Sequence, residues 1–308
     1  MRAVIVITGP TATGKTALGI RLAKKIDGEI VSADSMQVYK YMDIGTAKPT
    51  LDERRDVPHH LIDFIPPSED YSVARYVEDA SKCIDDILKR KKQPILVGGS
   101  GLYIDSLLLG RTFSARGDEI LRKKLEDEFD SIGGNAMLSK LRDVDAESAA
   151  KLHINDKKRI IRALEAFLTT GKTISQHDAL SKNHPPKYDA IKVALTFSDR
   201  TELYSKIDDR VDEMMSRGLE AEVRTLLNMG ISSKCTSMQA IGYKEISSAI
   251  VDKTDIITAV DKVKMESRRY AKRQLTWLRR DNEVKWTAWK SSPDLDLGVE
   301  EISALMMS

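Results

Sequence analysis

Cysteine is scarce in this 308-residue chain, and long hydrophobic runs are missing. Its two cysteines, Cys83 and Cys235, lie far apart in sequence and cannot form a zinc site by themselves. A reducing, cytoplasmic compartment therefore fits better than a disulfide scaffold. No apolar run reaches the roughly 18 residues of a membrane-spanning helix, and the N-terminus leaves no room for a signal peptide before the first strand-like segment. We expect a soluble cytoplasmic protein without a membrane partner.

An excess of charge of one sign is missing as well. The chain has 49 basic and 47 acidic side chains and a formal net charge of +2. This balance does not itself indicate a nucleic-acid partner, so any such signal must be local. Internal repeats and low-complexity tracts are absent, and nothing requires more than a monomer. The length exceeds what a single core usually organises, so we expect one α/β domain that carries a smaller module.

Strand-like apolar segments alternate with amphipathic helical segments, which predicts an α/β fold with a parallel sheet flanked by helices. The predicted strands are residues 3–8, 29–33, 94–97 and 191–197, and the clearest predicted helices are 15–26 and 73–91. Residues 118–185 are charged and helix-rich, and we interpret them as an inserted all-helical module. The core is then formed by residues 1–117 and 186–308, of which the tail beyond Asn282 shows no informative pattern.

A phosphate-binding loop follows the first predicted strand. Residues 9–16 match the pattern G-x-x-x-x-G-K-[ST], in which backbone N–H groups converge on phosphate oxygens. Lys15 adds a positive charge, and the Thr16 hydroxyl can ligate magnesium. The predicted phosphate-binding residues are Gly9, Pro10, Thr11, Ala12, Thr13, Gly14, Lys15 and Thr16. The loop alone does not say whether a nucleotide such as ATP or another phosphate compound is held.

Two polar side chains follow other predicted strands, where the carboxyl ends of a parallel sheet gather functional groups. Asp34 follows the second strand and could be a general base, a magnesium ligand or a helix cap. Ser100 lies in a glycine turn after the third, and its hydroxyl could be catalytic or could satisfy the loop backbone. We therefore expect a possible base, Asp34, and the Ser100 hydroxyl to lie close to the phosphate-binding loop at one edge of the sheet.

Two weaker signals lie farther along. Lys48 lies in a turn that leaves the same sheet edge, where a solvated lysine is the usual case and a phosphate contact the alternative. The adjacent pair His59 and His60 is a poor metal site, because neighbouring residues of a strand point to opposite faces.

Two basic segments supply the local charge signal. The predicted helix from Asn155 or Asp156 to Gly171 carries four cations in its first turns, where the helix dipole favours carboxylates. Either a nucleic-acid phosphate or acidic neighbours could relieve this conflict, the acidic candidates being Asp143, Asp145 and Glu147. The second segment, residues 262–280, has eight basic residues and one acid, interleaved with Tyr270 and Trp277. Its predicted basic helix face comprises Arg269, Lys272, Arg273 and Arg280. Together the two segments favour an RNA or DNA partner.

In combination these motifs resemble the bacterial tRNA dimethylallyltransferases, also called tRNA isopentenyltransferases. The resemblance spans nearly the whole chain in order, through residues 9–16, 31–39, 42–49, 97–103, 155–165, 241–243 and 271–279. It implies transfer of a dimethylallyl group from dimethylallyl diphosphate to N6 of the adenosine 3′-adjacent to a tRNA anticodon, with Mg²⁺ as cofactor. The C-terminal zinc finger common in eukaryotic members is missing.

The resemblance also implies roles for individual residues. Asp34 matches the catalytic base, Ser100 stands where the family usually has threonine, and Arg122 matches an arginine that assists the transition state, although residues 116–117 depart from the family pattern. Lys48 and Arg200 match diphosphate contacts. The implied contacts with the anticodon stem-loop are Asp34, Ser35, Met36, Gln37, Lys158, Arg159, Ile160, Ile161, Arg162, Gln239, Ala240, Ile241, Gly242, Tyr243, Lys244, Arg268, Arg269, Tyr270, Ala271, Lys272 and Arg273.

Other activities fit the phosphate loop alone. A small-molecule or nucleoside kinase would bind ATP there, with Asp34 activating a hydroxyl. A nucleotide-dependent RNA-binding switch would have no chemical product. An isopentenyltransferase acting on free adenine nucleotides would not need the helical insert or the basic segments.

Overall fold

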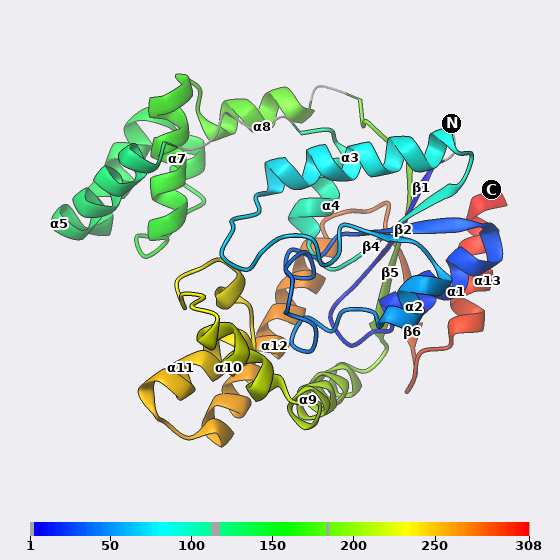
Figure 1. The fold of residues 1–308 in the computed structure, drawn as a ribbon. Coiled ribbons are helices and arrows are strands. Elements are labelled where there is room, and N and C mark those ends of the chain that lie inside the picture. Colours follow the sequence, from blue (N-terminus) through cyan, green and yellow to red (C-terminus); the bar gives the residue numbers. More distant parts are fainter. Residues whose placement is uncertain (1–2, 112–117, 183–184, 308) are drawn as a thin grey trace. The chain divides into compact units, whose positions relative to one another are not determined.

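The computed structural model describes residues 3–111, 118–182 and 185–307, and it divides into two compact units (Figure 1). The first unit comprises Met1–Leu108 and Tyr188–Ser308, and the second comprises Leu109–Lys187. The departing residues 116–117 of the family pattern lie outside the described residues.

A six-stranded, all-parallel sheet forms the centre of the first unit, in the order β3-β2-β4-β1-β5-β6. The strands are β1 (Val4–Thr8), β2 (Gly28–Ser32), β3 (His59–His60), β4 (Gln93–Val97), β5 (Ala190–Phe197) and β6 (Lys285–Trp289). The predicted α/β fold and its four predicted strands are confirmed, each within one residue at either end. Because all strands run the same way, the segments after β1, β2, β4 and β5 leave from one edge.

Both faces of this sheet are buried, because successive side chains of a strand alternate between them. Val4 and Val6 contribute to one apolar core, while Ile5 and Ile7 contribute to the other. The helices that supply the first core are α3 (Val73–Lys89), α4 (Gly101–Leu108), α10 (Leu219–Asn228), α11 (Tyr243–Asp252) and the first half of α12 (Ile256–Leu278), together with Val211 near the end of α9 (Arg200–Ser216). The helices that supply the second are α1 (Lys15–Ile26), α9, the end of α12 and α13 (Leu295–Met307).

The C-terminal tail, whose sequence shows no informative pattern, is a structural part of the sheet. β6 extends the sheet beside β5, and α13 packs against α1. Gly298 of α13 lies so close to Leu18 that an added Cβ would be 2.9 Å from its Cδ1. The pattern was missed because most side chains of this edge strand are exposed, which breaks the apolar run of a buried strand.

The remaining elements of the first unit are short. They are α2 (Leu51–Asp56), which begins at a capping box formed by Thr50 and Glu53, and a single 3₁₀ turn at Ser237–Gln239. Within the described residues, every helix is too short or too polar to cross a membrane.

The described part of the second unit contains helices and no strand, in agreement with an all-helical module. They are α5 (Glu119–Val144), α6 (Ala146–Ala149), α7 (Lys157–Thr170) and α8 (Ile174–Lys182). Gly133 has a φ of 81° and breaks α5 into two helical stretches. The apolar core of the second unit is formed mainly by α5 and α7, through residues that include Leu125, Met137, Leu141, Ile160 and Leu164.

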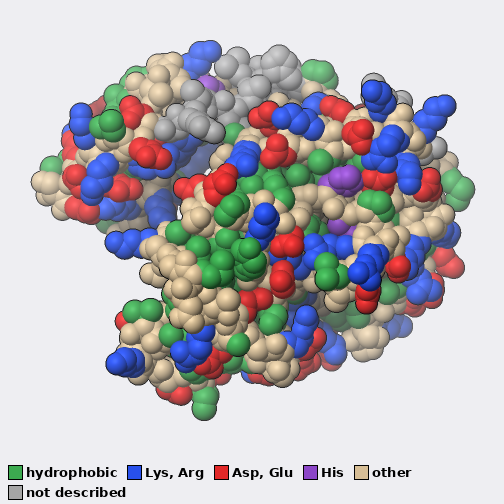
Figure 2. Space-filling model, in the orientation of Figure 1, with side chains coloured by type: hydrophobic (Ala, Val, Ile, Leu, Met, Phe, Trp, Pro, Cys, Tyr) green, Lys and Arg blue, Asp and Glu red, His purple; other side chains and the backbone are tan. Residues whose placement is uncertain are grey.

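The molecular surface carries charge of both signs. Figure 2 shows basic and acidic side chains interspersed over the visible face, with no continuous basic block. This agrees with the nearly balanced composition, so electrostatic arguments about a site depend on its own residues.

Candidate active site

The phosphate loop joins β1 to α1 in a tightly constrained conformation. Gly9 has a φ of 134°, and a Cβ there would lie 2.3 Å from the carbonyl oxygen of Leu195. Gly14 is left-handed, with a φ of 82°, and precedes α1. The indole Nε1 of Trp289 donates to the Thr13 carbonyl at 3.0 Å. The C-terminal strand therefore holds the loop in shape.

A cavity of about 960 Å³ opens beside this loop in the first unit. The segments after β1, β2 and β4 all contribute to its wall, as predicted for the carboxyl edge of the sheet. Helices α9 and α12 close it from other sides. The sequence-predicted residues that line it are Thr11, Ala12, Thr13, Gly14, Lys15, Thr16, Asp34, Ser35, Met36, Gln37, Lys48, Gln239, Ala240, Ile241, Tyr270 and Arg273.

Asp34 shapes its own turn in this cavity. Its Oδ1 accepts hydrogen bonds from the backbone N–H groups of Met36 and Gln37, at 2.8 and 3.3 Å. No helix begins here, so the helix-cap alternative does not apply, and the bonds form a local Asx turn instead. Among the described residues, Oδ2 has no hydrogen-bond or ion-pair partner. One oxygen thus fixes the carboxylate while the other is available to a ligand.

Ser100 lies beside this turn. Its Oγ accepts from the backbone N–H of Ser35 at 3.2 Å, and Tyr270 of α12 lines the cavity. Burial, followed by the charge of Asp34, raises the pKa of Tyr270 to about 12. Tyr270, which the resemblance implied as a contact of the anticodon stem-loop, therefore carries a protonated hydroxyl and lines the cavity.

Two cations near Asp34 have few partners. Lys15 Nζ donates to the Pro10 carbonyl at 2.6 Å, and burial, with repulsion from Arg210, lowers the pKa of Lys15 to about 7. Arg210 of α9 lines the same cavity, and its Nε is buried without a hydrogen-bond partner. Burial lowers the pKa of Arg210, and the negative charge of Asp34 opposes that shift.

Sequence reasoning missed Arg210, although a signal exists. It lies on the buried stripe of α9, beside Ile207 and Val211, at a helical position where an apolar residue is usual. A cation at such a position needs a partner, and in this fold it faces the phosphate-loop cavity.

Gln274 of α12 is a second residue that was not assigned to the site. Its Oε1 accepts from the Thr11 backbone N–H at 3.3 Å, and its Nε2 donates to the Gly99 carbonyl at 2.9 Å. One amide therefore ties the phosphate loop to the turn that carries Ser100.

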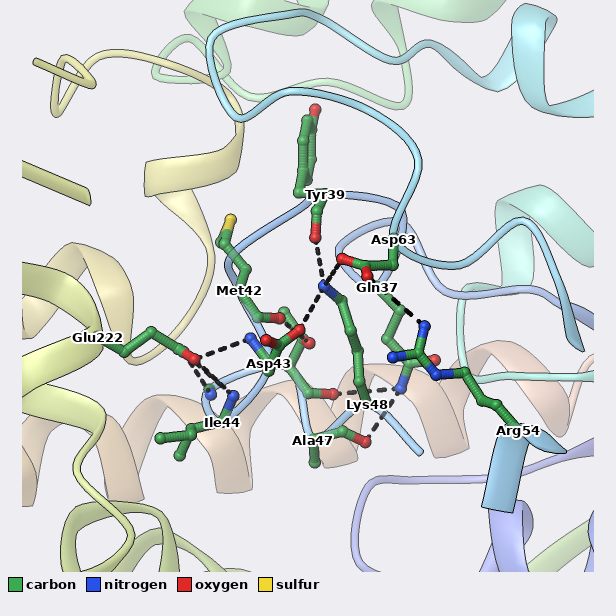
Figure 3. A network of polar contacts seen from close by, with 12 residues as sticks. Gln37, Tyr39, Met42, Asp43, Ile44, Ala47, Lys48, Arg54, Asp63 and Glu222 are labelled. Atoms are coloured by element: carbon green, nitrogen blue, oxygen red, sulfur yellow. Dashed lines mark hydrogen bonds and ion pairs between the residues drawn. The ribbon is translucent and has the colours of Figure 1, made fainter. Parts of the chain in front are cut away.

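Lys48 lies in a different electrostatic environment from Lys15, and Figure 3 shows its ammonium among oxygen atoms of the protein. Its ammonium donates to the Tyr39 carbonyl at 2.5 Å and to the carboxylates of Asp43 and Asp63 at 2.7 and 2.8 Å. Only 1% of the side chain is exposed. An ammonium has three donors, and all three are used here. A diphosphate contact by Lys48 would require it to leave one of these oxygens.

Glu222 of α10 fixes the loop that leads to Lys48 (Figure 3). Its carboxylate accepts from the backbone N–H groups of Asp43, Ile44 and Gly45 at 2.9 to 3.2 Å. The hydroxyl of the fully buried Tyr243 also donates to it, at 2.5 Å. Tyr243, predicted as a tRNA contact, therefore has its side chain inside this network.

Gln37 joins this loop to the Asp34 turn. Its Nε2 donates to the carbonyls of Thr46 and Ala47 at 3.2 and 3.3 Å. The Ser32 hydroxyl donates to its Oε1 at 3.4 Å. Both ends of the Gln37 amide are thereby held by the protein.

Arg200 is not part of the large cavity. It lies at the start of α9 and borders a smaller cavity with Lys272 and Arg279. The predicted common face of α12 is also corrected, because Lys272 borders the small cavity while Arg273 borders the large one. One turn earlier in the helix, Arg268 pairs with Asp208.

The remaining members of the predicted tRNA contacts differ in exposure. Arg269 is exposed and pairs with Glu266, and Lys244 is exposed at the start of α11. Ala271 is buried in the core, so its side chain is not available for a contact with tRNA. Gly242 has a φ of 95° and lets the chain turn into α11.

In the second unit, Arg122 is held by an acidic partner. Its Nη2 donates to the Glu165 carboxylate at 3.0 Å, and Arg162 donates to the same buried group at 2.9 Å. The basic start of α7 is further relieved by an ion pair between Lys157 and Asp130. The acids considered from the sequence were therefore the wrong ones, since Asp145 accepts from Ser148 and Ser175, and Glu147 pairs with Lys151.

Helix α7 begins and ends as expected. Asp156 is the N-cap residue, although its carboxylate accepts from His153 rather than from the first turn, and Gly171 ends the helix with a φ of 68°. Ile160 and Ile161 are buried, while Lys158 and Arg159 are the cations of this segment without an ion pair among the described residues.

Histidine, cysteine and carboxylate side chains were considered as metal ligands. The described residues contain no group of three or more His, Cys, Asp or Glu that could hold a metal ion. His60 instead hydrogen-bonds to buried Glu29 at 2.8 Å, and the Nδ1 of His59 to the Val57 carbonyl at 2.7 Å.

Comparison with known proteins places this arrangement in a family. A family model described as IPP transferase matches residues 37–281. The chain is 48% identical to the tRNA dimethylallyltransferase of Acetivibrio thermocellus, over 92% of this chain and 90% of that protein. It is 49% identical to the one from Carboxydothermus hydrogenoformans, with the same coverage.

Solved structures agree. The full-length tRNA isopentenylpyrophosphate transferase from Bacillus halodurans is 40% identical, with a TM-score of 0.74 over 100% of this chain and 96% of that chain. A eukaryotic dimethylallyltransferase acting on tRNA is 31% identical, with a TM-score of 0.81 over 100% of this chain and 78% of that one. With its phosphate loop, Asp34 turn and parallel sheet, the chain belongs to the IPP transferase family.

Proposed function

We propose that this protein transfers a dimethylallyl group from dimethylallyl diphosphate to N6 of the adenosine 3′-adjacent to the anticodon in tRNA, releasing diphosphate. The observation that carries the proposal is a single cavity that contains Asp34, Lys15 and Arg210. One carboxylate oxygen of Asp34 is available to a ligand, and the two nearby cations have few partners in the protein. The names of the relatives, tRNA dimethylallyltransferases that match nearly the whole chain, support the substrates.

The phosphate loop and the two cations hold the group that leaves. A diphosphate departs more readily when donors and positive charges stabilise its developing negative charge in a site largely closed to water. The backbone of residues 11–16, Lys15 and Arg210 supply these donors and positive charges at the cavity wall. Binding also relieves the electrostatic repulsion between Lys15 and Arg210, so both charges become favourable together.

Asp34 receives the proton. The N6 amine is a weak nucleophile because its lone pair is delocalised into the adenine ring. When N6 forms a bond to C1 of the dimethylallyl group, the C1–O bond breaks and its electron pair leaves with diphosphate. The N6 proton passes to the available oxygen of Asp34, which the Met36 and Gln37 amides orient. Tyr270 lines the same cavity, and Ser100 accepts from the Ser35 N–H beside the Asp34 turn, so we assign both hydroxyl side chains to positioning the substrates.

A magnesium ion fits the donor set of the loop. Mg²⁺ commonly takes one or two protein oxygens and completes its shell with substrate phosphates and water. The Thr16 hydroxyl lines the cavity and has no hydrogen-bond partner among the described residues, so it can serve as that ligand. When bound, the ion would neutralise charge on the diphosphate.

The tRNA must present its adenine to this cavity. A base in an anticodon loop can be extracted from its stack at modest cost, which allows N6 to reach a buried carboxylate. Segments 34–37 and 239–241 line the cavity where that base would enter. We assign the basic start of α7, with Lys158 and Arg159, to the phosphates of the stem-loop, and we expect one chain to act as a monomer.

The test is a product assay. Purified protein is incubated with magnesium, dimethylallyl diphosphate and unmodified tRNA, and the digested nucleosides are weighed by mass spectrometry. N6-dimethylallyladenosine is expected. ATP consumption without a prenylated nucleoside would indicate a kinase, and equal prenylation of free adenine nucleotides would exclude tRNA as the specific acceptor.

A further inference from the structure

A second, smaller cavity of about 170 Å³ lies where β5 ends, between the start of α9 and the last turns of α12. Its floor is apolar and buried, formed by Phe197, Leu203 and Leu275. Its rim is polar and basic, formed by Arg200, Lys272 and Arg279 with the hydroxyl residues Thr196, Ser198 and Thr276.

The rim has three positive charges and no negative one. No carboxylate lines the cavity, and none of the three cations has an ion pair within the part of the chain that the structure describes. Arg200 donates through Nε to the Tyr204 hydroxyl at 2.7 Å and stacks on that ring at 5.1 Å, a neutral partner that orients it. The neighbouring acid Asp199 is occupied as the cap of α9, where it accepts from the Thr201 N–H.

Helix α12 separates this cavity from the large one. Lys272, Leu275, Thr276 and Arg279 follow the i, i+3, i+4, i+7 spacing of a single helix face and all line the small cavity. The side chains of Ser267, Tyr270 and Gln274 line the phosphate-loop cavity instead. The two cavities therefore have different walls, and the small one is not used by the proposed transfer.

We propose that the small cavity is a second anion site, which binds one phosphate group through Arg200, Lys272 and Arg279. Like charges around a hollow repel one another, and a phosphate relieves the repulsion while accepting charge-assisted hydrogen bonds from arginine and lysine. The volume lies below the roughly 300–1,000 Å³ of typical pockets for drug-sized ligands, which suits a phosphate group rather than a whole nucleotide. Resting on the proposed function, the source is a backbone phosphate of tRNA outside the anticodon; a free phosphate ion has the same chemistry.

The test compares two double variants with the same loss of charge. Arg200→Gln with Arg279→Gln removes two rim cations and leaves Lys272 in place. The control, Lys25→Gln with Lys89→Gln, removes exposed lysines from the ends of α1 and α3, at the opposite edge of the sheet. Circular dichroism checks the fold of each. Binding of full-length tRNA is measured against salt concentration without dimethylallyl diphosphate, and binding of inorganic phosphate is measured with saturating inorganic diphosphate in the phosphate loop.

The rim variant is expected to flatten the plot of log K against log salt by about 0.7 to 0.9, the contribution of one phosphate, relative to the control. Unchanged tRNA binding with lost inorganic phosphate binding would support the site with a free anion as its ligand. If the rim variant matches the control in both tRNA binding and inorganic phosphate binding, the proposal is wrong. A raised KM for dimethylallyl diphosphate in Arg200→Gln alone would also contradict it, since Arg200 would then serve the diphosphate. Because tRNA binding is read without transfer, an inactive wild type would reject the proposed function and leave this result intact.

Discussion

Two lysines line the same cavity in opposite electrostatic states. Lys15 has one carbonyl partner, lies near Arg210 and has its pKa lowered to about 7. Lys48 has three oxygen partners, two of them carboxylates, and a side chain that is almost completely buried. The first charge is poorly compensated by the protein, whereas the second is fully compensated.

The difference distinguishes charged groups that are available to bind a ligand from charged groups that stabilise the fold. Buried charges are normally paired, so a buried charge without a partner is a candidate for binding a counter-charge. By this criterion Lys15, Arg210 and the available oxygen of Asp34 are the candidates for the proposed chemistry. Lys48 and Glu222 instead hold the loop that supports Gln37.

The largest expected effect is that of Asp34→Asn. The amide oxygen still accepts from the Met36 and Gln37 N–H groups, so the turn survives while the proton acceptor is lost. We expect kcat to fall by about 10²–10⁴ with tRNA affinity nearly unchanged, measured by single-turnover prenylation and filter binding. Asp34→Ala also breaks the turn and is expected to weaken tRNA binding. If Asp34→Asn retained kcat, Asp34 would not be the base.

Lys15→Met is expected to follow. Loss of a cation aimed at the leaving group should lower kcat/KM for dimethylallyl diphosphate by about 10²–10³. Thermal stability of the unliganded protein should not fall, because the variant removes a desolvated charge that Arg210 repels. Initial rates and a melting curve check both parts. A large loss of stability would mean that Lys15 is structural, as Lys48 is.

Lys48→Met should show the reverse pattern. Removing the ammonium leaves Asp43 and Asp63 without their partner, and because both carboxylates are partly exposed we expect a loss of about 2 kcal/mol of unfolding free energy. Urea unfolding measures it, with Lys25→Met as the control at an exposed site. Unchanged stability together with a large rise in KM for dimethylallyl diphosphate would restore the diphosphate contact suggested by resemblance.

The smallest effect concerns pH. With its pKa lowered to about 7, Lys15 is mostly neutral at pH 8, and a bound diphosphate favours its charged form. Binding at pH 8 should therefore take up a proton, and affinity should fall by up to about tenfold per pH unit above 7. In the unliganded protein the unfolded state binds more protons, so stability should rise between pH 7 and 10. Calorimetry in buffers of different ionisation enthalpy gives the proton uptake, which Lys15→Met should abolish.

Local patterns in the sequence were sufficient for the phosphate loop, α1 and the four strands that carry apolar runs. They also predicted that Asp34 and Ser100 lie close together, because the parallel strands β2 and β4 end at one edge of the sheet. The sequence pattern did not predict β6, because most of its side chains are exposed and it lacks the apolar run of a buried strand. Local sequence patterns also did not predict the partners of Lys48 or the surroundings of Arg210. These contacts are made by segments that are distant in sequence and adjacent only in the folded chain.

The most direct test of the comparison is the affinity of inorganic diphosphate for the wild type, Lys15→Met and Lys48→Met, measured by titration calorimetry with magnesium at a temperature where all three are folded. The account predicts that Lys15→Met weakens binding by at least about tenfold, the loss of one charge-assisted contact, while Lys48→Met stays within about twofold of the wild type. Equal weakening by the two substitutions would contradict it.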